Sequence, residues 1–504
     1  MRNSYSYLDP DLGWHLKVGE EISRSFSVPS QNFYNYTFTG NWVDHEWLAN
    51  LLTFKIYNTF GYLALNVFFA LIIVLAAILL NILSRKYFKN IPDWIIAFFQ
   101  IFGLIACLPH FGIRIQEFSF IFFIIELWIL ESFINRRSGR ALLCLLPLFY
   151  LWVNMHGSFL FGLGILIIFL FIKCIEKLVS LSELKKYLVE KDIFGKREFS
   201  LVLLVILGSL GVTLLTPYGL ELYSFLGGYS NTYYLKAIQE WLPQYFFPFD
   251  YLQLLYLCFS SFIVVIFFYN LKNCKENKIN IWHLSLYFLL FILAFKSRRN
   301  FPLMFVASFL LLSQSFFTSL ELDKIKSLNL RKELKYFLLI VMFLTALSNL
   351  LSYKSFSDPF KSFCSTYPCK AVNYLKQAGQ YSNSNIFNEY NWGGYLIWAY
   401  PEKKLFIDGR LPQVDYKGHT FMEEYAEFSK VGTDYKKKLA EYDIQIILIK
   451  TNNDIIKANK FEKYFFQLQE KNLVFPRYLR LYLEGSSEWE KIYSDSVASV
   501  YAKK

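Results

Sequence analysis

Residues 58–84 read NTFGYLALNVFFALIIVLAAILLNILS and contain no charged side chain over 27 positions. A helix of about 20 apolar residues crosses the ~30 Å hydrocarbon core of a bilayer, so this stretch predicts a transmembrane helix. Similar apolar runs follow it as far as residue 352. We predict ten spans: 58–84, 91–109, 117–134, 141–155, 157–176, 199–216, 251–270, 281–296, 300–319 and 336–352.

The composition agrees with a polytopic α-helical membrane protein. Of the 504 residues, 55% are hydrophobic, 20% aromatic and only 18% charged. These values exclude a wholly soluble enzyme, a disordered protein and a small disulfide-rich protein. A formal net charge of +12 is compatible with nucleic-acid binding. Much of the basic excess, however, falls in loops between spans, where it anchors topology, so we expect no nucleic-acid partner.

The distribution of Lys and Arg predicts the orientation. Before residue 353, 21 basic residues follow the odd-numbered spans and nine lie on the opposite side. Positive charge is retained in the cytoplasm, so residues 1–57, the loop 217–250 and residues 353–504 are expected to face outward. The chain then comprises an extracytoplasmic N-terminal segment (1–57), a transmembrane domain (58–352) and an extracytoplasmic α/β domain (353–504). A prokaryotic plasma membrane is the expected location.

Two acidic clusters with Trp neighbours lie in the outward N-terminal segment. Their ionisable residues are Asp9, Asp11 and His15, then Asp44, His45 and Glu46. Such carboxylates can act as a general base or hold a hard divalent cation through oxygen. The alternative is that they are solvated loop residues with a helix cap. We take Asp9 and Asp11 as candidate catalytic residues and His15, Asp44, His45 and Glu46 as candidate substrate-binding residues. Asp11, Asp44 and Glu46 are candidate ligands for Mg²⁺ or Mn²⁺.

A basic turn at 296–300, Lys-Ser-Arg-Arg-Asn, lies on the outward side against the positive-inside bias. Three cations between two spans need an anionic partner, and Arg suits bidentate contact with phosphate. We therefore predict that Arg298 and Arg299 bind a lipid-linked phosphate. The alternative is that they snorkel to lipid head groups. Arg114, in the outward loop with His110, is a weaker second candidate.

Further outward elements are candidate binding sites or simple turns. His156 lies in the Asn-Met-His-Gly hairpin at 154–157 and is either a substrate-binding residue or an exposed turn residue. Trp392 lies in the Tyr-Asn-Trp-Gly-Gly-Tyr element at 390–395, after a predicted strand, where ligand sites of α/β sheets are common. It either contacts the acceptor or docks the domain, with the glycines letting a helix begin close to the sheet. The Asp-Gly-Arg sequence at 408–410 is most simply a turn with an internal ion pair, and the alternative is a role in acceptor binding.

The C-terminal residues alternate helical and strand patterns. We predict helices at 368–378, 420–441 and 459–469, strands at 384–388, 404–407 and 443–449, and antiparallel strands in the tail 478–502. The apolar stretch 443–449 is expected to be central and buried. Cys364 and Cys369 are five positions apart on the outward side, where a local disulfide can persist. No nucleotide-binding loop is present in the sequence, so no nucleotide cofactor is expected.

Taken in order, these motifs resemble the GT-C glycosyltransferase superfamily, which includes protein mannosyltransferases and the oligosaccharyltransferase catalytic subunit. The resemblance is to a poorly characterised prokaryotic branch and covers most of the chain. The matching residues are Asp9, Asp11, Trp14, His15 and Gly19; His45 to Leu48; Asn154, His156 and Gly157; and Pro217 to Gly219.

The resemblance implies a polyprenyl-phosphate sugar donor, an inverting transfer and, in some members, a divalent cation. The superfamily carries an essential Asp in the first outer loop, and that role falls here on Asp9 or Asp11. In the family this Asp follows a first helix, whereas no predicted span precedes it here. Either the span at 58–84 translocates the N-terminal segment, or a further helix precedes residue 1.

The sequence thus predicts a hexosyltransferase that moves a sugar from a polyprenyl phosphate to a lipid, glycan or protein acceptor at the outer membrane surface. A carboxylate would take the acceptor proton, and the Arg residues would stabilise the departing phosphate. The alternatives are a carrier or flippase for a lipid-linked glycan and a non-catalytic membrane scaffold. A transporter needs polar residues deep within its spans. In this chain the mid-span positions are nearly all apolar, with Glu126 the main exception, which favours catalysis at the membrane surface over transport.

Overall fold

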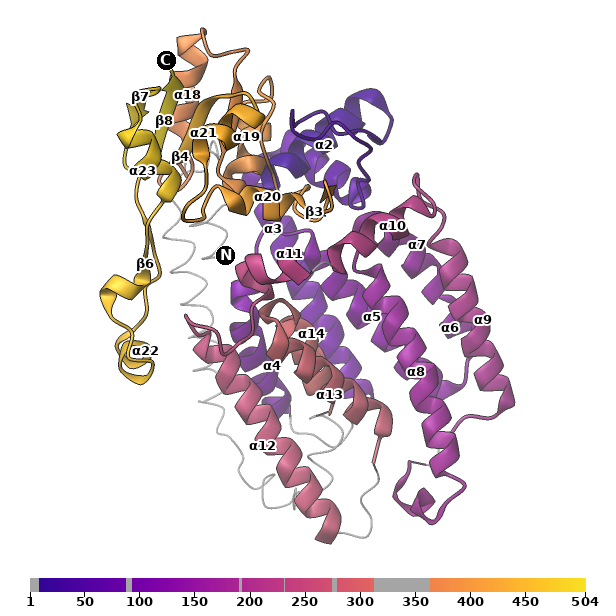
Figure 1. The fold of residues 1–504 in the computed structure, drawn as a ribbon. Coiled ribbons are helices and arrows are strands. Elements are labelled where there is room, and N and C mark those ends of the chain that lie inside the picture. Colours follow the sequence, from indigo (N-terminus) through magenta and orange to yellow (C-terminus); the bar gives the residue numbers. More distant parts are fainter. Residues whose placement is uncertain (1–8, 88–92, 190–192, 231, 274–278, 312–362) are drawn as a thin grey trace. The chain divides into compact units, whose positions relative to one another are not determined.

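The computed structural model describes residues 9–87, 93–189, 193–230, 232–273, 279–311 and 363–504. It consists of helices followed by a domain of mixed helices and strands (Figure 1). The chain divides into two compact units. Among the described residues, unit 1 is formed by those within 68–219 and 240–311, and unit 2 by those within 9–67, 220–239 and 363–504. The N-terminal segment therefore belongs to the same unit as the C-terminal domain.

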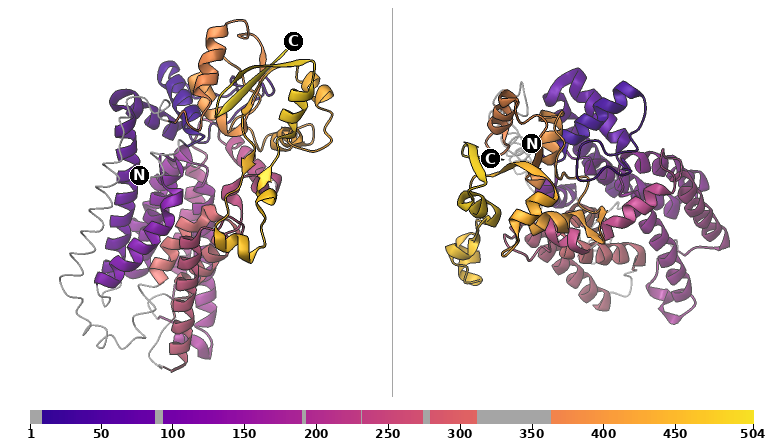
Figure 2. Two further views of the ribbon diagram at one scale, coloured as in Figure 1. Left: turned by 90° about the vertical axis from the view of Figure 1, so that its left-hand side faces the viewer. Right: turned by 45° about the horizontal axis from the view of Figure 1, so that its top comes forward.

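Unit 1 is helical, and its helices run alongside one another (Figures 1 and 2). Segments with so many apolar side chains favour the helical form in an apolar medium, because a helix satisfies its backbone hydrogen bonds within itself. The helices are the C-terminal part of α3 (Trp47–Tyr87), α4 (Asp93–Cys107), α5 (Gln116–Arg136), α6 (Gly139–Leu143), α7 (Leu145–Met155), α8 (Phe159–Val179), α9 (Lys196–Val212), α12 (Tyr251–Asn273), α13 (Ile281–Lys296) and α14 (Phe301–Leu311).

Two helices of the described chain are long and apolar enough to cross a membrane, within Trp47–Lys86 and Phe159–Val179. Shorter apolar helices occupy Ile96–His110, Gly139–Met155, Tyr251–Val265 and Ile281–Lys296. These helices agree with the predicted membrane class but do not confirm ten spans. The predicted span 336–352, and the part of span 300–319 after residue 311, lie outside the described residues. Helix α3 begins before its predicted span and is interrupted at Gly61, whose φ of 78° suits glycine.

Unit 2 combines the N-terminal segment with the C-terminal domain. Its helices are α2 (Leu12–Ser25), the start of α3, α10 (Glu221–Gly227), α11 (Thr232–Ala237), α18 (Cys369–Ala378), α19 (Gly393–Ala399), α20 (Phe421–Glu427), α21 (Tyr435–Glu441), α22 (Lys460–Phe465) and α23 (Tyr478–Gly485). Its strands are β1 (Asn385–Asn388), β2 (Asp415–Tyr416), β3 (His419–Thr420), β4 (Ile444–Lys450), β5 (Asp454–Ile455), β6 (Val474–Phe475), β7 (Trp489–Ser494) and β8 (Ala498–Lys503).

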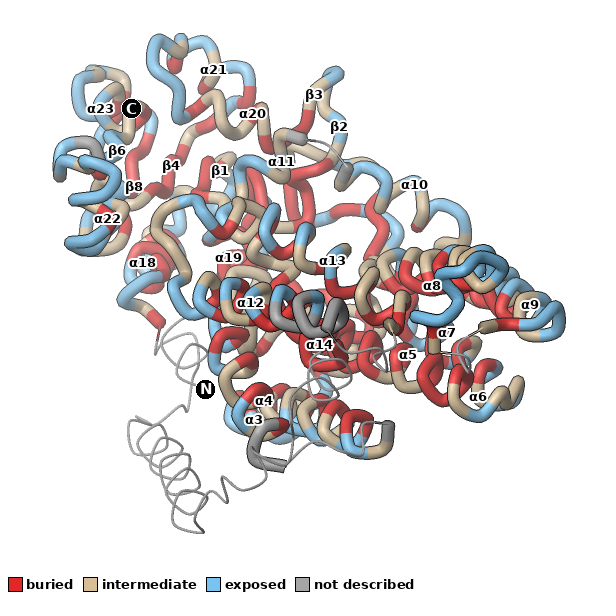
Figure 3. Tube along the Cα trace, turned by 90° about the horizontal axis from the view of Figure 1, so that it is seen from below, coloured by how far each residue is buried: buried red, intermediate tan, exposed pale blue. Residues whose placement is uncertain are grey.

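A four-stranded sheet of order β1-β4-β8-β7 forms the centre of the C-terminal domain. Strand β1 pairs with β4 in parallel, and the other pairs are antiparallel. The Ile-rich β4 is internal and almost wholly buried, as its apolar sequence predicts (Figure 3). Isolated bridges extend the sheet beyond β1, from Ile386 to Leu405 and from Leu405 to Asn35.

Several predictions for this domain are confirmed and others are wrong. Helix α18, strands β1 and β4, and the Cys364–Cys369 disulfide are present. The predicted strand 404–407 pairs only through the bridges at Leu405, and the predicted helix 420–441 is two helices, α20 and α21. The tail does not begin as a strand: residues 478–485 form α23, and antiparallel pairing starts with β7.

Candidate active site

A buried ion pair closes the turn at residues 408–410. Arg410 Nε donates to Asp408 Oδ1 and Arg410 Nη2 donates to Asp408 Oδ2, both at 2.8 Å. Both side chains are buried, and this bidentate geometry is the strong form of an Arg–carboxylate contact. The predicted internal ion pair is therefore confirmed.

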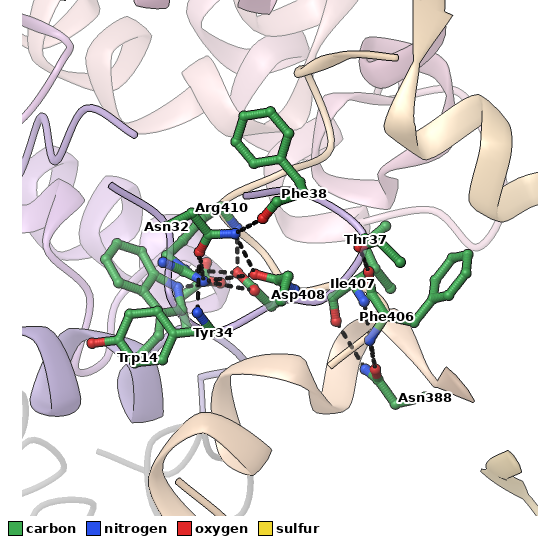
Figure 4. Close-up of polar contacts among 12 residues, drawn as sticks. Trp14, Asn32, Tyr34, Thr37, Phe38, Asn388, Phe406, Ile407, Asp408 and Arg410 are labelled. Carbon is green, nitrogen blue, oxygen red and sulfur yellow. Dashed lines mark hydrogen bonds and ion pairs between the residues drawn. The ribbon is translucent and has the colours of Figure 1, made fainter. Parts of the chain in front are cut away.

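The same guanidinium holds the N-terminal segment in place (Figure 4). Arg410 Nη2 also donates to the Oδ1 atoms of Asn32 and Asn35, each at 3.1 Å. The guanidinium lies over the rings of Tyr34 and Trp42, 4.4 and 4.7 Å from their centroids. Desolvated cation–π contacts of this kind are favourable. One arginine thus fixes residues 32–42 against the 408–410 turn.

Hydrogen bonds across the sheet edge extend this docking. Leu405 N donates to Tyr34 O at 2.8 Å, and Thr37 Oγ1 donates to Phe406 O at 2.6 Å. Asn388, the last residue of β1, accepts from Phe406 N at 3.0 Å and donates to Ile407 O (Figure 4). The N-terminal segment is therefore built into the edge of the sheet beside β1.

Helix α2 approaches α19 to a distance that only glycine allows. A Cβ on Gly13 would lie 2.0 Å from Gly394 O, and a Cβ on Gly394 would lie 2.1 Å from Pro10 O. A Cβ on Gly393 would lie 2.5 Å from Asp408 Cα. The adjacent glycines therefore serve close packing, as one of the two interpretations of the 390–395 element predicted.

Trp392 lies inside unit 2. Its side chain is buried, and Nε1 donates to Thr366 O at 3.2 Å. These contacts favour a packing role for the indole over a contact with the acceptor. Substrate binding by Trp392 stays a prediction.

We expect Gly394→Ala to destabilise unit 2. The new methyl group would meet backbone at Pro10, which cannot move aside as a side-chain end does, and overpacking typically costs about 1–3 kcal/mol. Thermal unfolding of the full chain in detergent, with Gly485→Ala as the control, measures the effect. A Cβ on Gly485 meets nothing within 4 Å. Equal midpoints for the two variants would refute the close contact.

The candidate catalytic carboxylates lie where α2 begins. Trp14 Nε1 donates to Asp11 Oδ1, and Asp11 N donates to Asp9 Oδ1, both at 3.0 Å. Asp11 also lies against the 408–410 turn, since a Cβ on Gly409 would be 2.1 Å from Asp11 Oδ1. Both carboxylates are half-buried. A general base must be held firmly and still reach its substrate; the hydrogen bonds hold both side chains, and a catalytic role for Asp9 or Asp11 stays a prediction.

The second acidic cluster surrounds His15 of α2. His15 Nδ1 lies 2.6 Å from Asn50 Oδ1, and Asn50 Nδ2 donates to both oxygens of Asp44 at 2.9 Å. Glu46 lies between two imidazoles, 3.9 Å from His15 Nδ1 and 3.5 Å from His45 Nε2. The structure thus brings together four predicted site residues, with Asn50 joining His15 to Asp44.

The cluster defines which imidazole nitrogen of His15 is basic. Because the Asn50 amide nitrogen donates to Asp44, the Asn50 oxygen faces His15, and His15 Nδ1 must carry the proton. Burial lowers the pKa of His15 to about 3, so the ring is neutral at physiological pH. Nε2 is then the nitrogen that can accept a hydrogen bond, for example from a sugar hydroxyl.

The pH dependence of stability should reveal this pair. Burial raises the pKa of Asp44 to about 7 and lowers that of His15 to about 3. Between about pH 4 and 6.5, folded Asp44 keeps a proton that the unfolded chain releases, so rising pH destabilises the fold. Over the same range, folded His15 lacks a proton that the unfolded chain binds, so rising pH stabilises it. The two slopes, about 1.4 kcal/mol per pH unit each, oppose one another.

In Asp44→Asn only the His15 contribution remains. We therefore expect the unfolding midpoint of this variant, relative to wild type, to rise as the pH increases from about 4.5 to 6.5. His15→Gln should show the opposite trend. Thermal unfolding of the full chain at a series of pH values measures both. Curves parallel to wild type would show that neither group has the protonation state described.

The residues suggested as metal ligands do not fit a divalent cation. Asp44 is fully buried, and its oxygens accept from Asn50 Nδ2 and from Glu46 N. In the part of the chain that the structure describes, no group of three or more His, Cys, Asp or Glu side chains is arranged to hold a metal ion. Metal binding by Asp11, Asp44 and Glu46 stays a prediction without geometric support.

In unit 1, His156 stabilises the turn between α7 and α8. Ser158 N donates to His156 Nδ1 at 3.1 Å, and the hydroxyls of Ser119 and Ser158 lie 2.9 and 2.8 Å from the same nitrogen. Trp152 Nε1 donates to both hydroxyls. His156 is buried rather than exposed, and its contacts are those of a structural turn. Substrate binding by His156 stays a prediction.

The two arginines of the basic turn differ in their surroundings. Arg298 donates from Nε to Pro243 O at 3.3 Å and from Nη2 to the carbonyls of Phe246 and Pro248. It therefore holds the loop at 243–248, which precedes α12. Arg299 lies over the Trp241 ring, 4.9 Å from the centroid.

An ion pair lies close to Arg299. Arg114 pairs with Glu240 at 2.5 Å, and Glu240 also interacts electrostatically with Arg299. Arg298 thus donates to backbone carbonyls, whereas Arg299 contacts a ring and an acidic neighbour, and phosphate binding by either arginine stays a prediction.

Sequence reasoning missed the asparagines that organise unit 2. Asn50 lies in the first turn of α3 and follows Glu46, which immediately precedes the helix, by four positions, a spacing typical of residues one helical turn apart. That signal is present in the sequence, but many structural pairs share it. Asn32 and Asn35 carry no such signal, because their partner Arg410 is more than 370 positions away.

The fold is similar to that of solved oligosaccharyltransferases. A crystal structure of the Archaeoglobus fulgidus oligosaccharyltransferase, tethered with an acceptor peptide containing the NVT sequon, matches with a TM-score of 0.54 and 12% identity, over 98% of this chain and 70% of that one. Its apo form matches with a TM-score of 0.53 and 11% identity, over 89% and 67%. No family model and no curated protein matches the chain. The chain thus shares the fold of these oligosaccharyltransferases, which agrees with the fold that the predicted resemblance implies.

Proposed function

We propose that this GT-C-like chain is an integral membrane glycosyltransferase that moves a sugar from a polyprenyl-phosphate donor to an acceptor at the outer face of a prokaryotic plasma membrane. The observation that carries the proposal is the fold similarity over 98% of the chain, together with the firmly held carboxylates Asp9 and Asp11. The acceptor class is a lipid, glycan or protein. The proposed donor sugar is a hexose, which makes the proposed enzyme a hexosyltransferase.

The proposed reaction is a single inverting displacement. The acceptor hydroxyl attacks the anomeric carbon of the sugar while Asp9 or Asp11 takes its proton. The bond between the anomeric carbon and the phosphate oxygen breaks, and the polyprenyl phosphate leaves with the electron pair. His15 Nε2 accepts a hydrogen bond from a sugar hydroxyl, and the Glu46–His45 pair supports that position.

Arg299 is proposed to stabilise the leaving phosphate. A guanidinium over an aromatic ring is oriented and partly desolvated, which strengthens its contact with an anion. Arg114 and Glu240 form an ion pair in unit 1, and Glu240 interacts electrostatically with Arg299. Arg298 has a structural role in this scheme, because its donors hold the carbonyls of the preceding loop.

We expect Arg299→Ala to lower kcat/KM for the donor about tenfold or more, because a hydrogen bond to a charged group contributes about 1.5–3 kcal/mol and the charge on the phosphate develops in the transition state. The thermal midpoint should change little. Arg298→Ala should instead lower the midpoint by freeing the loop at 243–248. Initial rates at varied donor concentration, measured alongside thermal unfolding, separate the two effects. A fall in kcat/KM in Arg298→Ala alone would reverse the assignment.

The proposed function is tested with the full chain in proteoliposomes and a panel of synthetic polyprenyl-phosphate sugars. We expect cleavage of at least one donor, release of polyprenyl phosphate and transfer of the sugar to an added acceptor. Movement of the intact donor across the bilayer without cleavage would favour a flippase. Neither cleavage nor movement with any donor would favour a scaffold.

A further inference from the structure

An arm extends from the C-terminal sheet between β4 and α23 (Figures 1 and 2). We define the aromatic arm as residues 454–475, which contain β5, α22 and β6. Strands β5 and β6 pair only with each other in antiparallel fashion, and Ile456 N donates to Leu473 O at 2.9 Å. The arm is therefore a separate hairpin with a short helix at its tip.

The base and the tip of the arm are ordered by specific contacts. Arg477 pairs with Asp454 at 2.5 Å and also with Glu389, which joins the arm to the end of β1. At the tip, Asn459 and Glu462 form a capping box at the start of α22, with bonds of 2.8 and 2.9 Å. The hairpin is thus a defined projection of the domain.

The tip exposes large aromatic side chains. Relative exposure is 59% for Phe461, 87% for Tyr464, 67% for Phe465 and 42% for Phe466. Phe461 stacks on Phe465 at 5.6 Å, and Phe465 meets Phe466 edge-on at 5.2 Å, so the rings form one surface. Strands β4 and β8 of the central sheet are mostly buried, whereas the residues of α22 are mostly exposed (Figure 3). A contiguous apolar patch of this kind marks an interaction surface.

Lysines lie close to these rings in the sequence. Between residues 455 and 471 the sequence has four Lys and two Glu, and Glu462 is buried in the capping box. Aromatic rings with Lys at their edges suit the boundary between lipid head groups and acyl chains, where the rings enter the interface and the cations meet anionic phosphates.

We infer that the aromatic arm is a membrane-interface anchor, which inserts its rings at the head-group boundary of an anionic bilayer. Two helices of the described chain are long and apolar enough to cross a membrane, so a lipid surface is a partner that the chain's own composition favours. The arm would then hold the C-terminal domain at a set height over the membrane. This role is independent of the chemistry at Asp9 and Asp11.

The test places an environment-sensitive fluorophore at Tyr464→Cys in the full chain, with the five cysteines outside the disulfide replaced by serine. Proteoliposomes are made from phosphatidylcholine alone or with added phosphatidylglycerol, and carry a nitroxide on the lipid acyl chains. Glu490→Cys, exposed on β7 of the same domain, is the matched control. We expect severalfold stronger quenching at position 464 than at 490, and stronger quenching with the anionic lipid.

Second variants keep the result interpretable. Adding Phe461→Ser and Phe465→Ser should reduce quenching at position 464 in both lipids, and replacing the four lysines by glutamine should reduce it only with phosphatidylglycerol. Equal quenching at 464 and 490 would overturn the proposal. Energy transfer between labelled copies, rising with protein density and without lipid quenching, would also overturn it and assign the arm to self-association.

Discussion

Arg410→Met is expected to unfold unit 2 or to lower its stability by about 3–5 kcal/mol, a large part of the stability of a typical domain. The substitution leaves the Asp408 carboxylate buried without its bidentate partner. It also removes the donor to Asn32 and Asn35 and the cation between the rings of Tyr34 and Trp42.

Thermal unfolding and limited proteolysis of the full chain measure this effect. In the variant, the segment at residues 26–40 should become a preferred cleavage site, because its attachment to the sheet edge depends on Arg410. Arg24→Met is the control, since Arg24 forms an exposed pair with Glu20 that should contribute little. The double variant Asp408→Asn, Arg410→Met should recover part of the loss by removing the unpaired charge. A wild-type cleavage pattern in Arg410→Met would show that the segment is held by other contacts.

Asp11→Asn is expected to lower the rate of sugar transfer about 10²–10⁴-fold, the usual contribution of a general base. Asparagine keeps the shape of the side chain and the acceptor oxygen that binds Trp14 Nε1, so the fold should be retained. Asp9→Asn is tested in parallel, because either carboxylate can be the base. The variant at the carboxylate that is not the base should lose less of its transfer rate.

Separate measurements of kcat and KM distinguish chemistry from binding. Loss of the base lowers kcat, whereas a merely structural change also lowers the thermal midpoint. Asp415→Asn, at an exposed position of β2, is the control and should keep the wild-type rate. Wild-type turnover in both Asp9→Asn and Asp11→Asn would remove the base from the mechanism proposed here.

Local patterns were sufficient to predict much of the fold. The apolar run that became β4 and the Cys364–Cys369 spacing each carry their signal within a few residues. Helix α23 shows where such a signal is ambiguous. Leu479, Leu481 and Leu483 alternate as in a strand, yet only Leu479 and Leu483 are buried, one helical turn apart. The arrangement of neighbouring elements, rather than the local pattern, decides between the two.

The candidate site was predictable in its residue types but not in its assembly. The two acidic clusters are visible in the sequence, and the structure joins His15 to Asp44 and Glu46 through contacts of 2.6–3.9 Å. The contact of Asp11 with Gly409, and of Gly13 with Gly394, links positions nearly 400 residues apart. No spacing rule encodes such pairs, because they arise from tertiary packing of α2 on α19.

A polyprenyl phosphate with a photoreactive group beside its phosphate tests the central claim most directly. It is irradiated with the full chain in proteoliposomes, and the labelled peptides are identified by mass spectrometry. If the N-terminal carboxylates and the basic turn serve one reaction, label should appear both in the peptide with Asp9 and Asp11 and in the peptide with Arg299. Label confined to other peptides, such as those at residues 173–197, would contradict the account.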